Sequence, residues 1–63
     1  MADHRIPYAN WTTNLLEAIE VAEEGDTIYV HDEAMKMMAE SAIYRMRPDT
    51  IFNIVVENND DNG

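Results

Sequence analysis

The chain has 63 residues, of which 13 are aspartate or glutamate and 4 are lysine or arginine, so its formal net charge at pH 7 is −9. A field of this sign repels nucleic acid and anionic membranes and attracts basic proteins. Cysteine is absent and the apolar runs are short, which excludes disulfides, cysteine-based zinc or thiol chemistry and a membrane span, and a cytoplasmic protein is expected.

The first ten residues are expected to form an N-terminal arm of a single small domain that covers residues 1–57. Pro7 keeps the arm extended and has no backbone N–H, so the arm is at best an edge strand over residues 5–8. The remaining residues, 58–63, are polar and acidic and are expected to be a disordered tail.

A first helix is predicted over residues 14–24. Asn14 and Glu17 have the spacing of a capping box, and Gly25 suits the left-handed residue that follows a helix end. The apolar residues at helical spacing predict an inner face of Leu15, Ile19 and Ala22.

A strand is predicted over residues 27–30, where Ile28 and Val30 alternate with Tyr29. Asp32 is the expected N-cap of a second helix, which Pro48 ends. The apolar stripe of that helix is regular and consists of Met35, Met38, Ala39, Ala42, Ile43 and Met46.

The last predicted strand covers residues 51–56, which are rich in β-branched and aromatic side chains. We expect it to be covered on both faces or to be central in its sheet. The phrase EGDTIY at residues 24–29 is nearly repeated by RPDTIF at residues 47–52, which suggests two tandem helix-then-strand units. Independent turn preferences for aspartate and threonine would produce the same similarity.

These elements predict a small α/β fold in the order α-β-α-β, with a two-stranded parallel βαβ unit and an additional N-terminal helix. A parallel sheet of two strands is marginal in isolation. We therefore expect the sheet to be extended by the N-terminal arm as an edge strand or by a second copy of the chain, and a homodimer with a continuous sheet is favoured.

No catalytic residue, metal ligand or cofactor site is assigned, and an enzyme is not expected. His31, Asp32 and Glu33 follow the first predicted strand, where α/β folds place their sites, and a minimal hydrolase that uses His31 is one alternative. A histidine at a strand end followed by a capping aspartate explains the same residues without any activity.

Acidic side chains on the first helix are the stronger candidate site. Glu17, Glu20 and Glu24 are spaced so that their carboxylates would form a row, with Glu23 beside them. Such a row can substitute for a nucleic-acid backbone in a basic protein groove, or it can simply keep the surface solvated.

Met37 and Tyr44 form a second stripe on the second helix, outside its core series. Both residue types are enriched in protein interfaces, although a broad core would also bury them.

The sequence thus predicts a non-enzymatic, acidic protein-binding module. Its expected partner is a basic host protein that handles nucleic acid, and the chain would be a phage or mobile-element inhibitor that occupies the basic surface of this partner. Direct binding of the chain to nucleic acid or to a membrane is not expected. A structural homodimeric subunit or assembly factor is the alternative. The candidate contact residues are Glu17, Glu20, Glu23, Glu24, Met37 and Tyr44.

Overall fold

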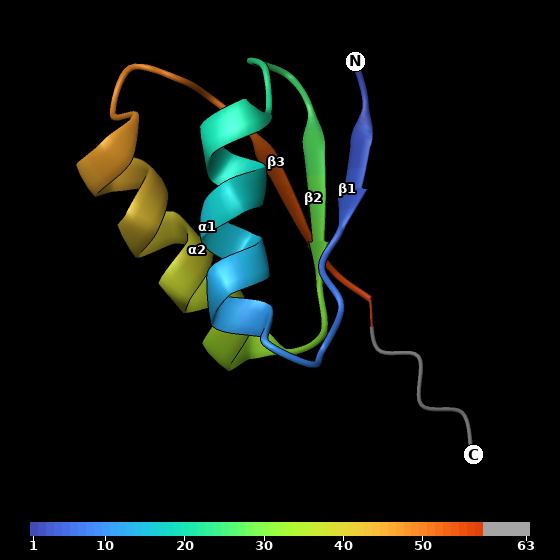
Figure 1. Ribbon diagram of the computed structural model, residues 1–63. Coiled ribbons are helices and arrows are strands. Elements are labelled where there is room, and N and C mark those ends of the chain that lie inside the picture. The colour runs from blue at the N-terminus through green and yellow to red at the C-terminus, as the bar shows by residue number, and fades with distance from the viewer. Residues whose placement is uncertain (58–63) are drawn as a thin grey trace.

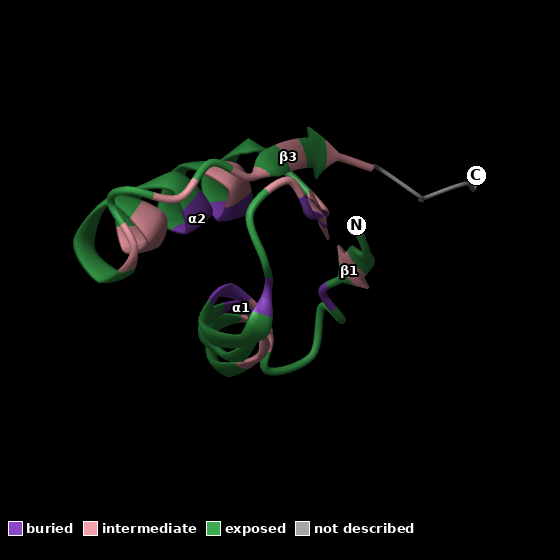
Figure 2. Cartoon of the chain, turned by 90° about the horizontal axis from the view of Figure 1, so that it is seen from above, coloured by how far each residue is buried: buried purple, intermediate pink, exposed green. Residues whose placement is uncertain are grey.

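The computed structural model describes residues 1–57, so the predicted acidic tail lies outside the described residues. The three strands are parallel, with β2 between β1 and β3. Both helices cover one face of this sheet and leave the other face open (Figures 1 and 2). In chain order the elements are β1 (Asp3–Arg5), α1 (Trp11–Val21), β2 (Thr27–Val30), α2 (Glu33–Met46) and β3 (Asn53–Val56).

β1 adds a strand that the predicted α-β-α-β order lacks, so the observed order is β-α-β-α-β. The N–H of Thr27 donates to the carbonyl of Ala2 at 3.0 Å, and the N–H of Ile6 donates to Tyr29 at 3.1 Å. The arm therefore does form an edge strand, but over Asp3–Arg5 rather than residues 5–8, since pairing stops where Pro7 offers no donor.

α1 begins and ends about three residues earlier than predicted. Asn10 is its N-cap, in a left-handed conformation, and the amide of Asn14 donates to the carbonyl of Ala9 at 3.0 Å instead of capping. At the other end Ala22 is extended, so Gly25, at φ 92°, belongs to the following turn and not to the helix end. The predicted inner face is nevertheless correct: the buried residues are Leu15, Ile19 and Ala22.

β2 and the start of α2 confirm their predictions. The Asp32 carboxylate accepts a hydrogen bond from the N–H of Met35 at 2.9 Å, which caps α2 as expected. Met35 and Ala39 are buried, whereas Met38 and Met46 are partly exposed. α2 covers only part of a narrow sheet. The apolar stripe that the sequence predicts for this helix is therefore wider than the face of the helix that is buried.

β3 is an edge strand, so the prediction of a central or doubly covered strand is wrong. Its burial alternates, with Ile54 and Val56 packed against the core and Asn53 and Val55 exposed. Thr27 pairs with Asn53 and not with Thr50, so the two copies of the repeated phrase are not structurally equivalent.

The core lies between the helices and the sheet. Neither helix among residues 1–57 is long and apolar enough to cross a bilayer. The buried apolar residues of the main cluster are Ile6, Leu15, Ile19, Ile28, Val30, Met35 and Ala39.

Candidate protein-binding surface

Four glutamates in the second half of α1 and in the turn after it make up what we call the acidic surface. Glu17 and Glu20 lie on the exposed side of α1, and Glu23 and Glu24 lie in the turn that follows it. Because the helix ends at Val21, the predicted helical row stops at Glu20, and Glu24 reaches the surface through the turn instead. All four residues are exposed.

None of these four carboxylates forms an ion pair within residues 1–57, where the ion pairs are His4 with Asp26 and Arg5 with Glu57. Arg47, which reaches the end of α1, is engaged with the backbone instead. Nη1 of Arg47 donates to the backbone carbonyls of Ile19, at 2.9 Å, and of Ala22. Its charge thus offsets the negative end of the α1 dipole, and the carboxylate groups remain free to meet another molecule.

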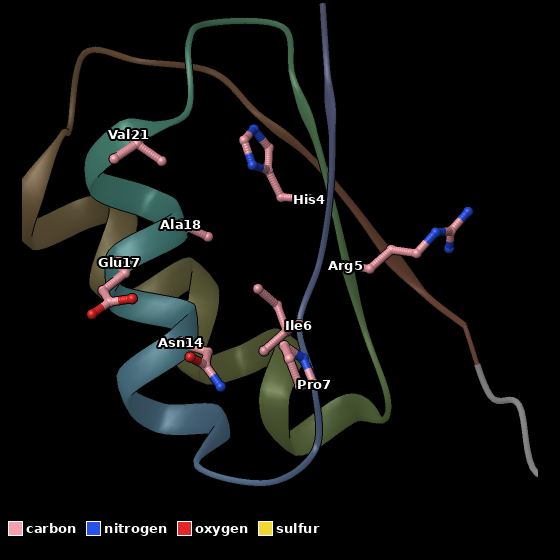
Figure 3. A pocket seen from close by; sticks show the side chains of 8 residues that line it. All are labelled: His4, Arg5, Ile6, Pro7, Asn14, Glu17, Ala18 and Val21. Carbon is pink, nitrogen blue, oxygen red and sulfur yellow. The ribbon is translucent and has the colours of Figure 1, made fainter.

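A groove of about 350 Å³ separates β1 from α1 and adjoins the acidic surface. Glu17 borders both, and the side chains of Ile6, Pro7, Ala18 and Val21 make much of the groove apolar (Figure 3). An apolar depression beside unpaired carboxylates suits a segment that carries both apolar and basic side chains. The residues that line the groove are His4, Arg5, Ile6, Pro7, Asn14, Glu17, Ala18 and Val21.

His4 extends from β1 toward α1 (Figure 3), where Nε2 lies 3.0 Å from the Asp26 carboxylate. Asp26 is buried and also accepts hydrogen bonds from the N–H groups of Ala2 and Glu23, each at 2.9 Å. Three hydrogen bonds hold the pKa of the Asp26 carboxyl far below its usual range. The bond from the Glu23 N–H has the largest effect, followed by the bond with His4 and the bond from the Ala2 N–H. The carboxylate stays ionised and ties β1 to the turn between α1 and β2.

The histidine–carboxylate pair anchors the first strand to the turn before β2. A catalytic pair of this kind activates a serine, threonine or cysteine, and none of these residue types is among those that line the groove.

Met37 and Tyr44 are highly exposed, at 67% and 78%, so the core of the single chain does not bury them. They are separated by seven residues on α2 and therefore lie on one side of it. α1 and α2 lie side by side in the helical layer (Figure 1), so these apolar side chains and the acidic surface belong to the same layer.

His31 is engaged in the fold. Its Nε2 lies 2.8 Å from the carbonyl oxygen of Ile6, and its ring meets that of Tyr8 edge-on at 5.7 Å. The neighbouring Asp32 caps α2. No group of three or more potential metal ligands occurs in the described part of the chain.

The sequence did not reveal the roles of Asp26, His4 and Arg47. Asp26 stands in the repeated phrase, but its counterpart Asp49 is exposed, so the phrase itself carries no signal for burial. Arg47 follows α2 in sequence, and only the packing of the two helices brings it to the end of α1.

No protein-family model, curated protein or solved structure matches this chain.

Proposed function

We propose that the protein acts by binding another protein that presents a basic surface. The observation that carries this proposal is the acidic surface, whose four carboxylates are exposed and have no cationic partner within residues 1–57. Two of the chain's four basic residues, Arg5 and Arg47, are already engaged with Glu57 and with the carbonyls of α1. These two cations therefore do not neutralise the carboxylates of the acidic surface.

The interaction combines charge with apolar contact. Unpaired carboxylates attract a basic partner over a distance set by the ionic strength. The groove beside Glu17 and the exposed side chains of Met37 and Tyr44 then provide apolar area. The partner proposed is a protein whose basic surface ordinarily takes nucleic acid, and the activity is inhibition by occupancy, as phage and mobile-element proteins perform it.

Affinity capture from host lysate at low and high salt tests the proposal. Immobilised protein should retain a basic protein at low salt, and double-stranded DNA should compete for that protein because both occupy the same surface. Neutralising the acidic surface with Glu17→Gln, Glu20→Gln, Glu23→Gln and Glu24→Gln should reduce the captured amount by at least about tenfold at low salt.

A matched control removes the same number of charges elsewhere. Asp3, Glu33, Glu40 and Asp49 are all exposed and lie outside the acidic surface. Their amide variants should leave capture within about twofold of the original protein, since only the net charge changes. Equal loss in both variants, or capture that DNA does not displace, would refute the proposed function.

A further inference from the structure

The outer edge of β3 has no neighbouring strand within residues 1–57. The N–H of Asn53 donates to Asp26 at 3.0 Å and that of Glu57 donates to Val30 at 2.7 Å, so alternate residues of β3 face β2. Backbone groups alternate in direction along a strand. The N–H and C=O groups of Ile54 and Val56 therefore point away from the sheet, where residues 1–57 provide no further strand.

The opposite edge of the sheet is protected and this one is not. β1 carries the charged side chains of Asp3 and Arg5 and is followed by Pro7, which cannot donate a hydrogen bond. Residues 50–56 contain neither a charged side chain nor a proline. Charges and prolines are the usual means of blocking strand addition, so of the two sheet edges formed by residues 1–57 the β3 edge is the one that lacks such protection.

Apolar side chains flank this edge on both faces of the sheet. Val55 is 41% exposed on the open face. On the other face, α2 turns 100° per residue, which places Met38 on the flank opposite Ile43 and Arg47. Since Arg47 reaches α1, the flank with Met38 is the one above the outer edge of β3, and Met38 is 48% exposed there.

The composition of the edge suits another copy of this chain as the occupant, because two apolar, β-branched segments 50–56 can pair with each other without bringing carboxylates together. Two copies with a net charge of −9 repel each other, so a contact between them is favoured where acidic residues are absent. The uncharged segment 50–56 meets this condition, and Arg45 lies on the same flank of α2 as Met38.

We propose that two copies of the chain pair through their β3 edges about a two-fold axis. Two-fold symmetry makes identical strands antiparallel, with Ile54 opposite Ile54 of the other copy and Val56 opposite Phe52. Each outward N–H and C=O of Ile54 and Val56 then gains a partner. The result is a continuous mixed sheet in which the two Met38 flanks approach each other and add apolar area.

This interface uses none of the residues of the acidic surface. α1 lies on the far side of α2 from the β3 edge (Figure 2), so a dimer leaves Glu17 and Glu20 exposed. The dimer and the proposed function can therefore be tested separately.

A chain of this length is accessible to chemical synthesis, which allows a test at the backbone. N-methylation of Ile54 removes an outward N–H and leaves the hydrogen bonds between β3 and β2 intact. N-methylation of Arg5 makes the same change at the outward edge of β1 and is the matched control. In sedimentation equilibrium over about a hundredfold range of concentration, the unmodified and Arg5-methylated chains should dimerise with the same Kd, and the Ile54-methylated chain at least about tenfold more weakly.

Adjacent methionines provide a second pair of variants. Met38→Lys should weaken the dimer, whereas Met37→Lys should leave it unchanged because Met37 is on the outer side of α2. In hydrogen exchange, the Ile54 and Val56 amides should become slower at high concentration. A monomer throughout the concentration range, or a dimer that Ile54 methylation leaves intact, overturns the proposal whatever the capture experiment shows.

Discussion

Arg47 and Ile19 are joined by a hydrogen bond of 2.9 Å from the guanidinium Nη1 to the backbone carbonyl oxygen. The same nitrogen also donates to Ala22, and the guanidinium lies 5.4 Å from the centre of the Phe52 ring. One side chain thus connects the end of α1, the end of α2 and the approach to β3. The last turn of α1 contains no basic residue of its own, so Arg47 provides the cation that this helix end lacks.

Arg47→Met should lower the free energy of unfolding by roughly 1–3 kcal/mol, because it retains the apolar stem but leaves carbonyl groups of α1 without their charged donor. Urea denaturation followed by circular dichroism measures the loss. Arg45→Met is the matched control, since Arg45 is exposed and should change stability by no more than about 0.5 kcal/mol. Equal effects of the two substitutions would contradict the role given to Arg47.

Asp26→Asn should destabilise the protein at neutral pH, because an amide offers a single acceptor oxygen where the carboxylate accepts from Ala2 and Glu23 on different atoms. The lowered pKa of Asp26 also has a definite pH dependence. A carboxyl with a lowered folded-state pKa stabilises the fold above its unfolded pKa of about 3.9 and loses that contribution as the pH falls toward the folded-state pKa.

The difference in urea midpoint between the original protein and Asp26→Asn should therefore shrink as the pH falls below about 4. Asp49→Asn, at the exposed counterpart in the repeated phrase, should show no such pH-dependent difference. A difference in urea midpoint that grows as the pH falls below about 4 would contradict the sign assigned to the Asp26 carboxyl.

Leu15 and Leu16 are neighbours in sequence with opposite environments, since Leu15 is buried and Leu16 is exposed on α1. Leu15→Ala should cost about 2–5 kcal/mol through the lost burial and the cavity left behind. Leu16→Ala should cost less than about 1 kcal/mol. Urea and thermal unfolding compare the two variants. A larger loss of stability for Leu16→Ala than for Leu15→Ala would contradict the rotation of α1 about its axis that buries Leu15.

The periodicity of apolar residues predicted the helices and the middle strand well. Leu15, Ile19 and Ala22 face the core as expected, and β2 has the predicted bounds. These features follow from local spacing, because burying one face of a helix or strand imposes its own period on the sequence.

Features that depend on distant partners were not predictable in the same way. β1 is three residues long and has no apolar alternation, and it pairs because Ala2 and Ile6 meet backbone groups of β2. The central position expected for β3 was wrong because apolar content does not distinguish a buried strand from an unprotected edge. The exposure of the acidic surface was foreseeable from charge, but the engagement of Arg47 with α1 was not.

β2 is hydrogen-bonded on one side to residues near the start of the chain and on the other to residues near position 55. A fragment that stops before β3 therefore leaves the middle strand with a single neighbour. The two ends of the described chain have to come together on either side of β2 before the sheet is complete, so folding depends on contacts between residues far apart in sequence.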